Sequence, residues 1–315
     1  MPNKIILPGG AGLVGQNLLP RLKAAGFTEI VVLDKHAANL AALHRRHPDV
    51  TAECVDLAEA GDWQRHFEGA AAVVMLQAQI GGPVLRDFVR NNVDATRHVL
   101  DAMKRHRVPR LVHISSSVVE SVANDFYTDT KKQQETLVLQ ATAVSGIECP
   151  VLRPTLMFGW FDRKHLGWLS RFMARVPVFP IPGDGRYMRQ PLYAGDFCKV
   201  IVSCVEGRVT SGTHNISGRE KIDYIDIIRE IKRATRARAL IVTLPYALFH
   251  AALWTWGLFD RNPPFTTQQL RALVAKDEFE LIDWPARFGV TATPFAAAID
   301  ETFNDPTYGH VALDF

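Results

Sequence analysis

Residues 4–15 read Lys4-Ile5-Ile6-Leu7-Pro8-Gly9-Gly10-Ala11-Gly12-Leu13-Val14-Gly15, a short apolar run followed at once by a glycine-rich turn. A helical pattern then continues to residue 25. In such a strand–turn–helix unit one glycine permits the tight turn, one lets a phosphate approach the backbone, and one lets the helix pack on the strand. The first amides of the helix favour an anion. The stretch therefore predicts a diphosphate site formed by Gly9, Gly12, Leu13, Val14 and Gly15.

The rest of the first half repeats this alternation of strand and helix. Further strands are predicted over residues 29–33, 50–55, 70–76, 110–114 and 147–152, and helices over 37–47, 83–106 and 128–145. Strands that alternate with helices of this length form βαβ units around a parallel sheet. Because such crossovers are right-handed, we expect an α/β fold with a doubly wound, Rossmann-type sheet.

An acidic residue stands where the adenosine ribose of a dinucleotide would meet this sheet. Asp34 ends the second strand, about 20 residues after Gly15, at the spacing of a ribose-binding carboxylate. A carboxylate there accepts the ribose hydroxyls and repels a 2′-phosphate, which favours NAD. Lys35 follows directly and leaves NADP open. Asp56 and Leu57, after the third strand, are placed to border the adenine.

A tyrosine and a lysine four residues apart open the predicted helix at residue 128. Tyr127 and Lys131 share one helix face at this spacing. A lysine ammonium beside a phenol favours the phenolate, so that the phenol can act as an acid or base on a carbonyl or hydroxyl. Ser115-Ser116-Ser117 follow the fifth strand, at the carboxyl edge where active sites gather. A serine there can hydrogen-bond the reacting oxygen.

Together these residues resemble the short-chain dehydrogenase/reductase superfamily, and within it the extended branch of NAD-dependent epimerases and dehydratases of nucleotide sugars. The resemblance covers most of the chain. In chain order its motifs are Gly9-x-x-Gly12-x-x-Gly15, Asn92-Val93-Asp94-Ala95-Thr96, Leu152-Arg153-Pro154 with Gly159, Gly183-Asp184-Gly185 with Arg189, Leu192-Tyr193 with Asp196, and Gly212-Thr213-His214-Asn215-Ile216.

The resemblance implies a role for each candidate site residue. Tyr127 would be the catalytic acid/base, and Lys131 its catalytic partner, which also holds the nicotinamide ribose, so that both belong to the cofactor site as well. Ser117, or second to it Ser116, would polarise the reacting oxygen, and Ser116 is placed on the substrate side. Arg189 would meet a substrate phosphate; the alternative is an ordinary surface arginine.

The chain departs from the family's pattern in several places. Gln77-Ala78-Gln79 replaces the usual His-Leu-Ala-Ala run after the fourth strand, and we place Gln77 in the cofactor site. Thr155-Leu156-Met157 stands where many nucleotide-sugar enzymes carry an asparagine, and their Arg-x-Gly-Asp segment is missing. The stretch between Ser117 and Tyr127 is also short. These departures concern the substrate more than the redox chemistry.

The regular alternation of strands and helices ends after residue 159. Three prolines and two glycines crowd residues 177–185, which predicts a loop. Later elements are less regular, with helices near residues 195–206 and 224–234 and a strand near 213–216. We expect residues 1–157 to form the dinucleotide-binding domain and residues 158–315 a smaller substrate-binding lobe, and we leave open the return of part of the second half to the sheet.

Composition narrows the classes of function. The 315 residues include 36 Lys or Arg and 33 Asp or Glu, and a net charge of +3 gives no sign of a nucleic-acid partner. The four cysteines have no zinc-ligand spacing, so no metal is expected. They fit a reducing cytoplasm better than a disulfide framework.

Residues 239–259 contain no Asp, Glu, Lys or Arg, and a stretch of this length could in principle span a bilayer. Pro245 divides them, which predicts a strand over residues 240–244 followed by a helix rather than a transmembrane span. We expect the helix to be a core helix of the second lobe. The alternative is peripheral contact with a membrane, since aromatic residues and a preceding basic run suit an interfacial helix.

Three functions fit these patterns. The leading hypothesis is an NAD-dependent enzyme that epimerises, or reduces the 4-keto form of, a nucleotide-activated sugar. The second is a dehydrogenase of a hydrophobic alcohol or ketone at a membrane surface. The third is a sensor or assembly protein that binds a dinucleotide without turnover, which the intact Tyr127, Lys131 and Ser117 disfavour. We also expect a cytoplasmic homodimer, because the resembling family commonly pairs the helices that correspond to residues 83–106 and 128–145.

Overall fold

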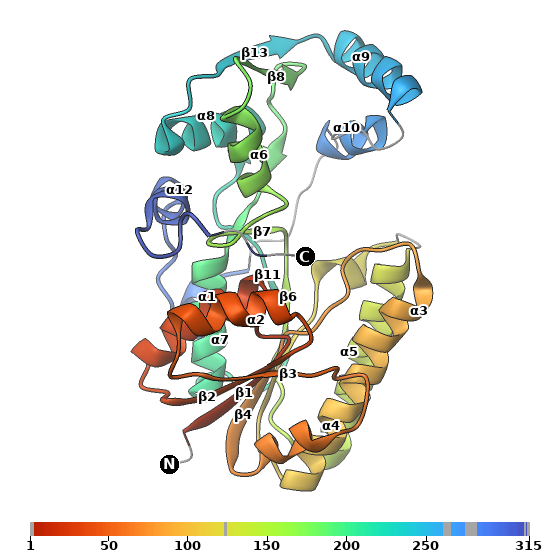
Figure 1. Ribbon diagram of the computed structural model, residues 1–315, viewed down its shortest axis with the longest axis vertical. Coiled ribbons are helices and arrows are strands. Elements are labelled where there is room, and N and C mark those ends of the chain that lie inside the picture. Colours follow the sequence, from red (N-terminus) through yellow and green to blue (C-terminus); the bar gives the residue numbers. More distant parts are fainter. Residues whose placement is uncertain (1–2, 123–124, 261–265, 275–281, 312, 314–315) are drawn as a thin grey trace.

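A seven-stranded parallel sheet forms the centre of the protein (Figure 1). The computed structural model describes residues 3–122, 125–260, 266–274, 282–311 and 313. The strand order is β11-β6-β5-β4-β1-β2-β3. Their bounds are β1 Lys4–Pro8, β2 Glu29–Asp34, β3 Thr51–Cys54, β4 Ala70–Met75, β5 Leu111–Ile114, β6 Val151–Pro154 and β11 Thr213–Ile216. The order reverses direction at β1, as a doubly wound sheet does, so the predicted fold class is confirmed.

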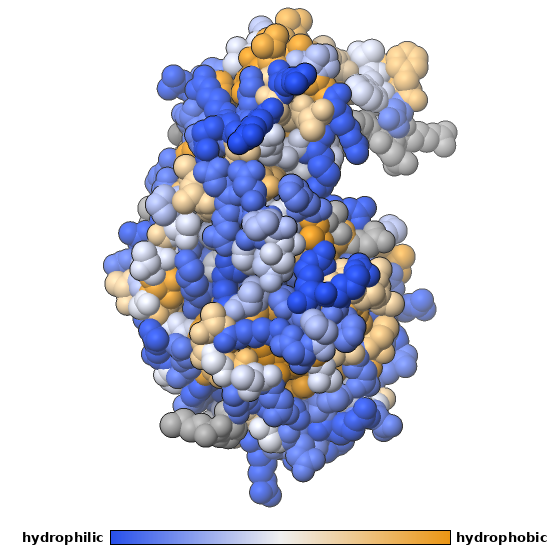
Figure 2. Space-filling model, turned by 60° about the vertical axis from the view of Figure 1, so that its left-hand side comes forward, coloured by the Kyte–Doolittle hydropathy of each residue, from blue (hydrophilic) through white to orange (hydrophobic). Residues whose placement is uncertain are grey.

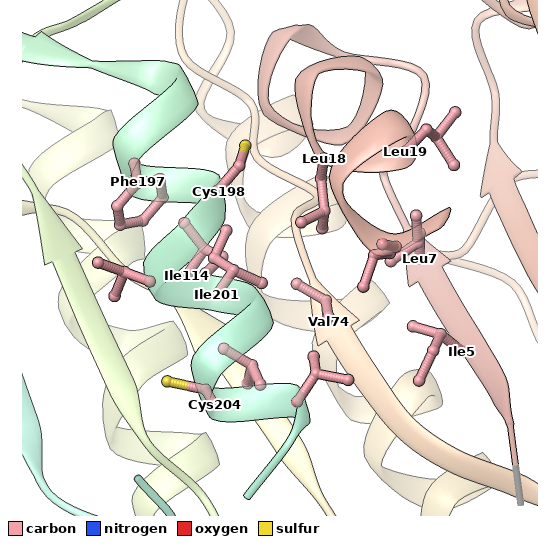
Figure 3. Close-up of a cluster of buried hydrophobic side chains, with 14 of the residues drawn as sticks. Ile5, Leu7, Leu18, Leu19, Val74, Ile114, Phe197, Cys198, Ile201 and Cys204 are labelled. Atoms are coloured by element: carbon pink, nitrogen blue, oxygen red, sulfur yellow. The ribbon is translucent and has the colours of Figure 1, made fainter. Parts of the chain in front are cut away.

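Helices cover both faces of this sheet. Helices α1 (Leu13–Ala24), α2 (Ala37–Arg46) and α7 (Ala194–Val205) share one hydrophobic cluster with the sheet. The opposite face carries α4 (Ala95–His106), α5 (Phe126–Ser145) and the 3-10 helix η1 (Asp62–Phe67). Figure 3 shows the first cluster, where Phe197 and Ile201 of α7 and Leu18 of α1 lie over Leu7 and Val74 of the strands. Burial on both faces explains the nearly unbroken apolar strands.

The predicted helix over residues 83–106 is interrupted by a wider turn. It consists of α3 (Leu85–Phe88), a π-helical segment η2 (Val89–Asp94) and then α4. A π-turn inserts an extra residue per turn, which changes the direction of the side chains and is frequent at functional sites. It holds Asn92 fully buried. Hydrophobic periodicity alone does not reveal such an insertion.

The sixth strand lies later than predicted. The expectation was residues 147–152, whereas β6 spans Val151–Pro154. Pro150 has no amide hydrogen to donate to a neighbouring strand, and before it only an isolated bridge joins Glu148 to Arg110. The strand therefore becomes regular only after Pro150.

A smaller lobe stands beyond the carboxyl edge of the sheet (Figure 1). Its core contains side chains of α6 (Leu166–Met173), β8 (Val178–Pro182), α8 (Tyr224–Thr235) and α12 (Phe295–Asn304). Strand β13 (Leu240–Leu244) pairs with β8 in parallel. Meanwhile α7 and β11, which follow β8 in the chain, belong to the sheet domain. The second half thus contributes to both bodies, and the division at residue 157 stays a prediction.

Helix α9 (Tyr246–Phe259) contradicts the expectation of a core helix. Its bounds match the predicted helix, but none of its residues is buried. It projects from the side of the smaller lobe, next to α10 (Thr267–Val274) (Figure 1). Its apolar composition predicts a buried helix. The lobe core is instead filled by α6, α8 and α12, which leaves α9 outside.

Candidate functional site

The glycine turn joins β1 to α1 with a different constraint at each glycine. Gly9 has a φ of +75°, and a Cβ there would lie 2.4 Å from the backbone nitrogen of Gln77. A Cβ on Gly15 would lie 2.2 Å from the carbonyl oxygen of Gly10, so only glycine lets α1 approach the strand this closely. Gly12 differs, because a Cβ there would meet nothing nearer than the Gly9 carbonyl oxygen at 3.6 Å. The backbone is therefore open at Gly12, where a phosphate needs access.

Helix α1 begins directly at this open position. Gly12 is its N-cap residue, no side chain caps it, and its first turn, which includes Leu13 and Val14, has no acidic residue. Uncapped amides at a helix N-terminus attract an anion. The arrangement fits the diphosphate of a dinucleotide.

Asp34 ends β2 beside this turn. Its carboxylate accepts hydrogen bonds from the amides of Ala11 and His36, each at 3.0 Å. Burial raises the pKa of Asp34 above its ordinary value, and these two amides act in the opposite direction. A carboxylate can accept about four hydrogen bonds, so Asp34 retains capacity for ribose hydroxyls.

The other predicted cofactor residues differ in whether their polar atoms already have partners within the protein. Gln77 lies against Gly9, and its Oε1 atom is buried without a hydrogen-bond partner in the part of the chain that the structure describes. Lys35 donates to Asn91 Oδ1 at 2.8 Å. Asp56 is held by Arg90 at 2.9 Å, and Leu57 belongs to the hydrophobic core. Gln77 thus offers an unused acceptor, whereas Asp56 and Leu57 are engaged within the protein.

Tyr127 lies on the first turn of α5, at the carboxyl edge of β5. The N-cap residue Asp125 fixes this turn by accepting from the Thr128 amide at 2.9 Å and from the Thr128 hydroxyl at 2.8 Å. The Ser116 side chain lies close enough to the Tyr127 phenol to lower its pKa. Ser117 begins the 3-10 turn η3 (Ser117–Glu120). Ser116 is thus near Tyr127, and the choice between Ser117 and Ser116 as the polarising serine stays a prediction.

Lys131 lies one turn further along α5 and is 1% exposed. Its ammonium donates to the Ile114 carbonyl oxygen at 2.9 Å and to the Gln134 side chain. Gln134 in turn donates to Thr96 Oγ1 at 2.9 Å, and Gln77 donates to the same oxygen at 3.3 Å. A buried chain of polar groups thus connects Lys131 to Gln77, beside the glycine turn.

Burial opposes charge on both candidate catalytic groups. Burial raises the pKa of Tyr127, while the nearby Ser116 side chain lowers it in part. Burial lowers the pKa of Lys131 to about 7, and the nearby Glu135 partly offsets this. Burial, followed by the charge of Lys131, also holds the pKa of His113 on β5 well below its usual range. His113 is therefore neutral beside Lys131, and Lys131 is the cation whose protonation changes near neutral pH.

Glu135 anchors the other side of α5 to the sheet. It accepts hydrogen bonds from the Ser115 hydroxyl at 2.5 Å and from the Arg153 guanidinium. Arg153 also donates to Glu120 at 2.7 Å. The three serines after β5 therefore have three different roles: Ser115 contacts Glu135, Ser116 lies near Tyr127, and Ser117 opens η3.

Arg189 lies apart from this cluster. It forms β9 (Met188–Arg189), which pairs with β12 (Ile222–Asp223) in the smaller lobe. Its guanidinium donates to the Leu273 carbonyl oxygen of α10 and lies near Tyr224. The structure thus places Arg189 across from the sheet edge rather than beside Tyr127.

Sequence reasoning missed the polar chain behind Lys131. Gln134 and Thr96 complete it, and Asn92 of the π-turn donates to Thr130 Oγ1 at 3.0 Å. The signal available for Gln134 was its position three residues after Lys131, on the same helix face. Asn92 and Thr96 belong to the motif at residues 92–96, but the sequence alone does not indicate a role for either side chain.

The fold and this cluster define a class: an enzyme that binds a dinucleotide at the carboxyl edge of a doubly wound sheet. A comparison with family models narrows it. The chain belongs to the NAD dependent epimerase/dehydratase family, whose model matches residues 5–217. It is an NAD-dependent enzyme of the short-chain dehydrogenase/reductase type.

The individual relatives have low sequence identity to this chain. A dTDP-glucose 4,6-dehydratase from Streptomyces niveus is 27% identical over 267 residues, which cover 74% of this chain and 78% of the relative. A 4-hydroxy-2-methyl-3-oxo-4-farnesyl-3,4-dihydroquinoline-1-oxide ketoreductase from Stigmatella aurantiaca is 24% identical, over 79% of this chain and 78% of the relative. The solved structure of a UDP-glucuronic acid 4-epimerase from Bacillus cereus in complex with NAD has a TM-score of 0.66 at 22% identity, over 77% of this chain and 86% of that chain. At this identity the structure supports the fold alone.

The described residues contain neither a metal-binding cluster nor a membrane-spanning helix. No group of His, Cys, Asp or Glu is placed to hold a metal ion there. Within the same residues, no helix is both long and apolar enough to cross a bilayer.

Proposed function

We propose that this enzyme moves a hydride between NAD and a sugar carbon of a nucleotide-activated sugar, with Tyr127 as the acid/base. The observation that carries the proposal is the placement of Tyr127, on the first turn of α5, near Ser116 at the carboxyl edge of β5. It sets a proton-transferring group and a polarising hydroxyl side by side, with Lys131 buried one helical turn away. Two groups in this geometry can hold and move a proton on one substrate oxygen.

NAD fits the residues at the sheet edge. Gly12 and the uncapped start of α1 would hold its diphosphate, Asp34 its adenosine ribose, and the unpartnered Oε1 of Gln77 would accept a hydrogen bond from it. Lys131 would face the nicotinamide ribose. When bound, NAD supplies the hydride acceptor.

The residues of the chain handle the proton. In the oxidising direction the substrate hydroxyl loses its proton to the Tyr127 phenolate while its carbon loses a hydride, and a ketone results. Ser116 hydrogen-bonds the same oxygen and stabilises the charge that develops on it. Lys131, when protonated, favours the phenolate form of Tyr127 through its charge. In the reducing direction Tyr127 returns the proton to the oxygen.

The sugar class is supported by the relatives, which include a dehydratase of dTDP-glucose and, by fold, an epimerase of UDP-glucuronic acid. The net reaction that we propose is 4-epimerisation or reduction of a 4-keto sugar. Arg189, across from Tyr127 in the smaller lobe, is our candidate for the contact with the nucleotide's phosphates. The homodimer and the cytoplasmic location stay predictions.

A second candidate is a dehydrogenase of a hydrophobic alcohol or ketone. The ketoreductase relative acts on a farnesylated quinoline, and the exposed apolar helix α9 suits contact with hydrophobic material. The proton chemistry at Tyr127 would be the same, so the two candidates differ only in the substrate.

The experiment is a substrate panel. The protein is mixed with NAD or its reduced form and with UDP- and dTDP-sugars, their 4-keto derivatives and, separately, hydrophobic ketones. The nicotinamide absorbance is followed and the products are separated by chromatography, because an epimerisation returns its hydride and leaves no net change in absorbance. We expect a change with one or more members of the sugar set. A change only with the hydrophobic set would favour the second candidate, and silence across both sets would contradict the proposal.

A further inference from the structure

The far end of the smaller lobe exposes a continuous apolar strip. Strand β13 runs along this end of the lobe, with the end of α8 at one side and α9 at the other (Figure 1). Leu240 and Val242 of β13 are exposed on one face, and Val178 of β8 is the strand partner of Leu240 and is exposed as well. Figure 2 shows hydrophobic side chains at this end of the molecule with strongly hydrophilic ones beside them. We call this surface, formed by β8, β13 and α9, the distal strip.

Helix α9 is the largest part of the distal strip. At 3.6 residues per turn its exposed apolar side chains cover most of the circumference, and they are Tyr246, Leu248, Trp254, Trp256, Leu258 and Phe259. Phe249 and Leu253 are half-buried on the remaining side. Trp254 and Trp256 are 59% and 53% exposed, and Phe259 is 87% exposed. A helix that is apolar all round is normally buried in a protein core or in a membrane. Within the described residues, neither the lobe core nor α10 buries it.

Basic residues outnumber acidic ones around the distal strip, where Asp184 follows β8 and Asp260 follows α9 and accepts a hydrogen bond from Trp256 at 3.2 Å. Residues 163–183 contain four arginines or lysines and residues 231–259 contain four more, and neither stretch contains an aspartate or glutamate. Arg236 and Arg238 precede β13, and Arg175 precedes β8 at the same end of the paired strands. Among the residues that the structure describes, these three arginines have no ion-pair partner. They are free to meet an anionic surface.

We propose that the distal strip docks this enzyme on an anionic lipid bilayer, with α9 lying in the headgroup region. Indole and phenol rings suit that region because they combine an apolar body with a polar tip. The arginines lie at the edge of the apolar surface, where they would meet lipid phosphates. Helix α9 has 14 residues, about 21 Å at 1.5 Å per residue, which is short of the roughly 30 Å hydrocarbon core. It would therefore rest in the interface rather than span it.

A bilayer fits this strip better than a second copy of the chain. A two-fold interface would set the same patch against itself, which would bring Arg175, Arg236 and Arg238 of both copies to one surface in excess of its carboxylates. A protein partner also tends to cover one side of a helix, whereas α9 is apolar on every side. Headgroups and upper acyl chains can surround a helix and accept positive charge along its border. The proposal is independent of which substrate the enzyme uses.

Vesicle co-sedimentation of the full chain tests this proposal. Vesicles of phosphatidylcholine alone are compared with vesicles that also contain phosphatidylserine. We expect binding to the mixed vesicles that weakens as salt is added, because counterions screen the arginines. The variant Trp254→Ser/Leu258→Ser should bind about tenfold more weakly or worse, since it removes apolar contact, and Arg236→Glu/Arg238→Glu should lose a similar factor, since each arginine near a membrane contributes about fivefold.

Two control variants carry the same chemical changes on the sheet domain. Leu139→Ser/Val144→Ser replaces exposed apolar residues of α5, and Arg45→Glu/Arg107→Glu reverses two exposed arginines. Both should bind vesicles like the unchanged protein, and thermal unfolding together with NAD binding confirms that each variant is folded. Equal loss in the control and distal variants, or no sedimentation with any vesicle, would overturn the proposal. So would self-association that the α9 variant abolishes in the absence of vesicle binding, because the strip would then be an interface between copies.

Discussion

At the residue scale, the serine that lies near Tyr127 is decided by the backbone just after β5. The sequence shows that three serines end this strand but not which one faces the tyrosine. The 3-10 turn begins at Ser117, and Ser116, its N-cap, accepts from the Val118 amide at 3.4 Å. This short turn leaves Ser116 near the phenol. A tight turn of this kind has no periodic signal, so the sequence does not show which serine faces Tyr127, and the choice between Ser116 and Ser117 stays a prediction.

Substitution of the two serines separates these roles. We expect Ser116→Ala to lower kcat by about 100-fold, because it removes a donor to the developing charge on the substrate oxygen. Ser117→Ala should leave kcat close to that of the unchanged protein. Steady-state kinetics with the substrate that the panel identifies makes the comparison. The reverse order of effects would return the polarising role to Ser117.

The polar residues behind Lys131 show a second limit at the residue scale. Tyr127 and Lys131 could be predicted because their spacing on one helix is local. Gln134 was equally local, but its value as a partner depends on Thr96, which α4 brings from 38 positions earlier in the chain. Contacts between elements are not visible in spacing.

At the element scale, the glycine turn could be predicted almost completely. Each of its constraints acts within a few residues: the left-handed φ at Gly9, the open backbone at Gly12 and the close approach at Gly15. The same holds for β13 and α9, whose bounds match the expected strand and helix because Pro245 separates them. The π-turn could not be predicted, because it depends on a single inserted residue. The late start of β6 could not be predicted either, because it depends on which partner strand lies beside Pro150.

Two glycine substitutions test the turn. Gly12→Ala should fold with a loss of less than about 1 kcal/mol, because its methyl group meets open space and only a helix cap changes, and it should weaken NAD binding by about tenfold or more, roughly 1.4 kcal/mol. Gly15→Ala should instead lower the free energy of unfolding by about 1–3 kcal/mol, because its methyl group would collide with the Gly10 carbonyl. Denaturant unfolding and calorimetric titration with NAD measure both.

The contrast between the two positions is the informative result. Unchanged NAD affinity in a folded Gly12→Ala protein would show that the diphosphate does not approach the turn at this point.

At the scale of the whole molecule, the alternation of strands and helices predicted the sheet, but not how the second half divides. Its α7 and β11 complete the sheet domain, while α6, α8 and α12 build the smaller lobe. The exposure of α9 was likewise beyond prediction, because composition shows that a helix is apolar but not whether space remains for it in a core.

The two bodies together explain why the chemistry belongs at the sheet edge. The candidate cofactor residues and Tyr127 lie on the sheet domain, and Arg189 lies on the smaller lobe. A substrate with a reacting sugar and a charged nucleotide would use both bodies. The assignment of Tyr127 as the group that moves the proton is the centre of this account.

One measurement tests that assignment most directly. The rate of hydride transfer is measured in the unchanged protein and in Tyr127→Phe, by nicotinamide absorbance for a net reduction or by chromatography of the product for an epimerisation, and NAD affinity is measured for both by calorimetry. The account predicts unchanged NAD affinity and a fall in the transfer rate of at least about 100-fold, because the phenylalanine ring cannot carry the proton. Transfer at the original rate in a folded, NAD-binding Tyr127→Phe protein would contradict it.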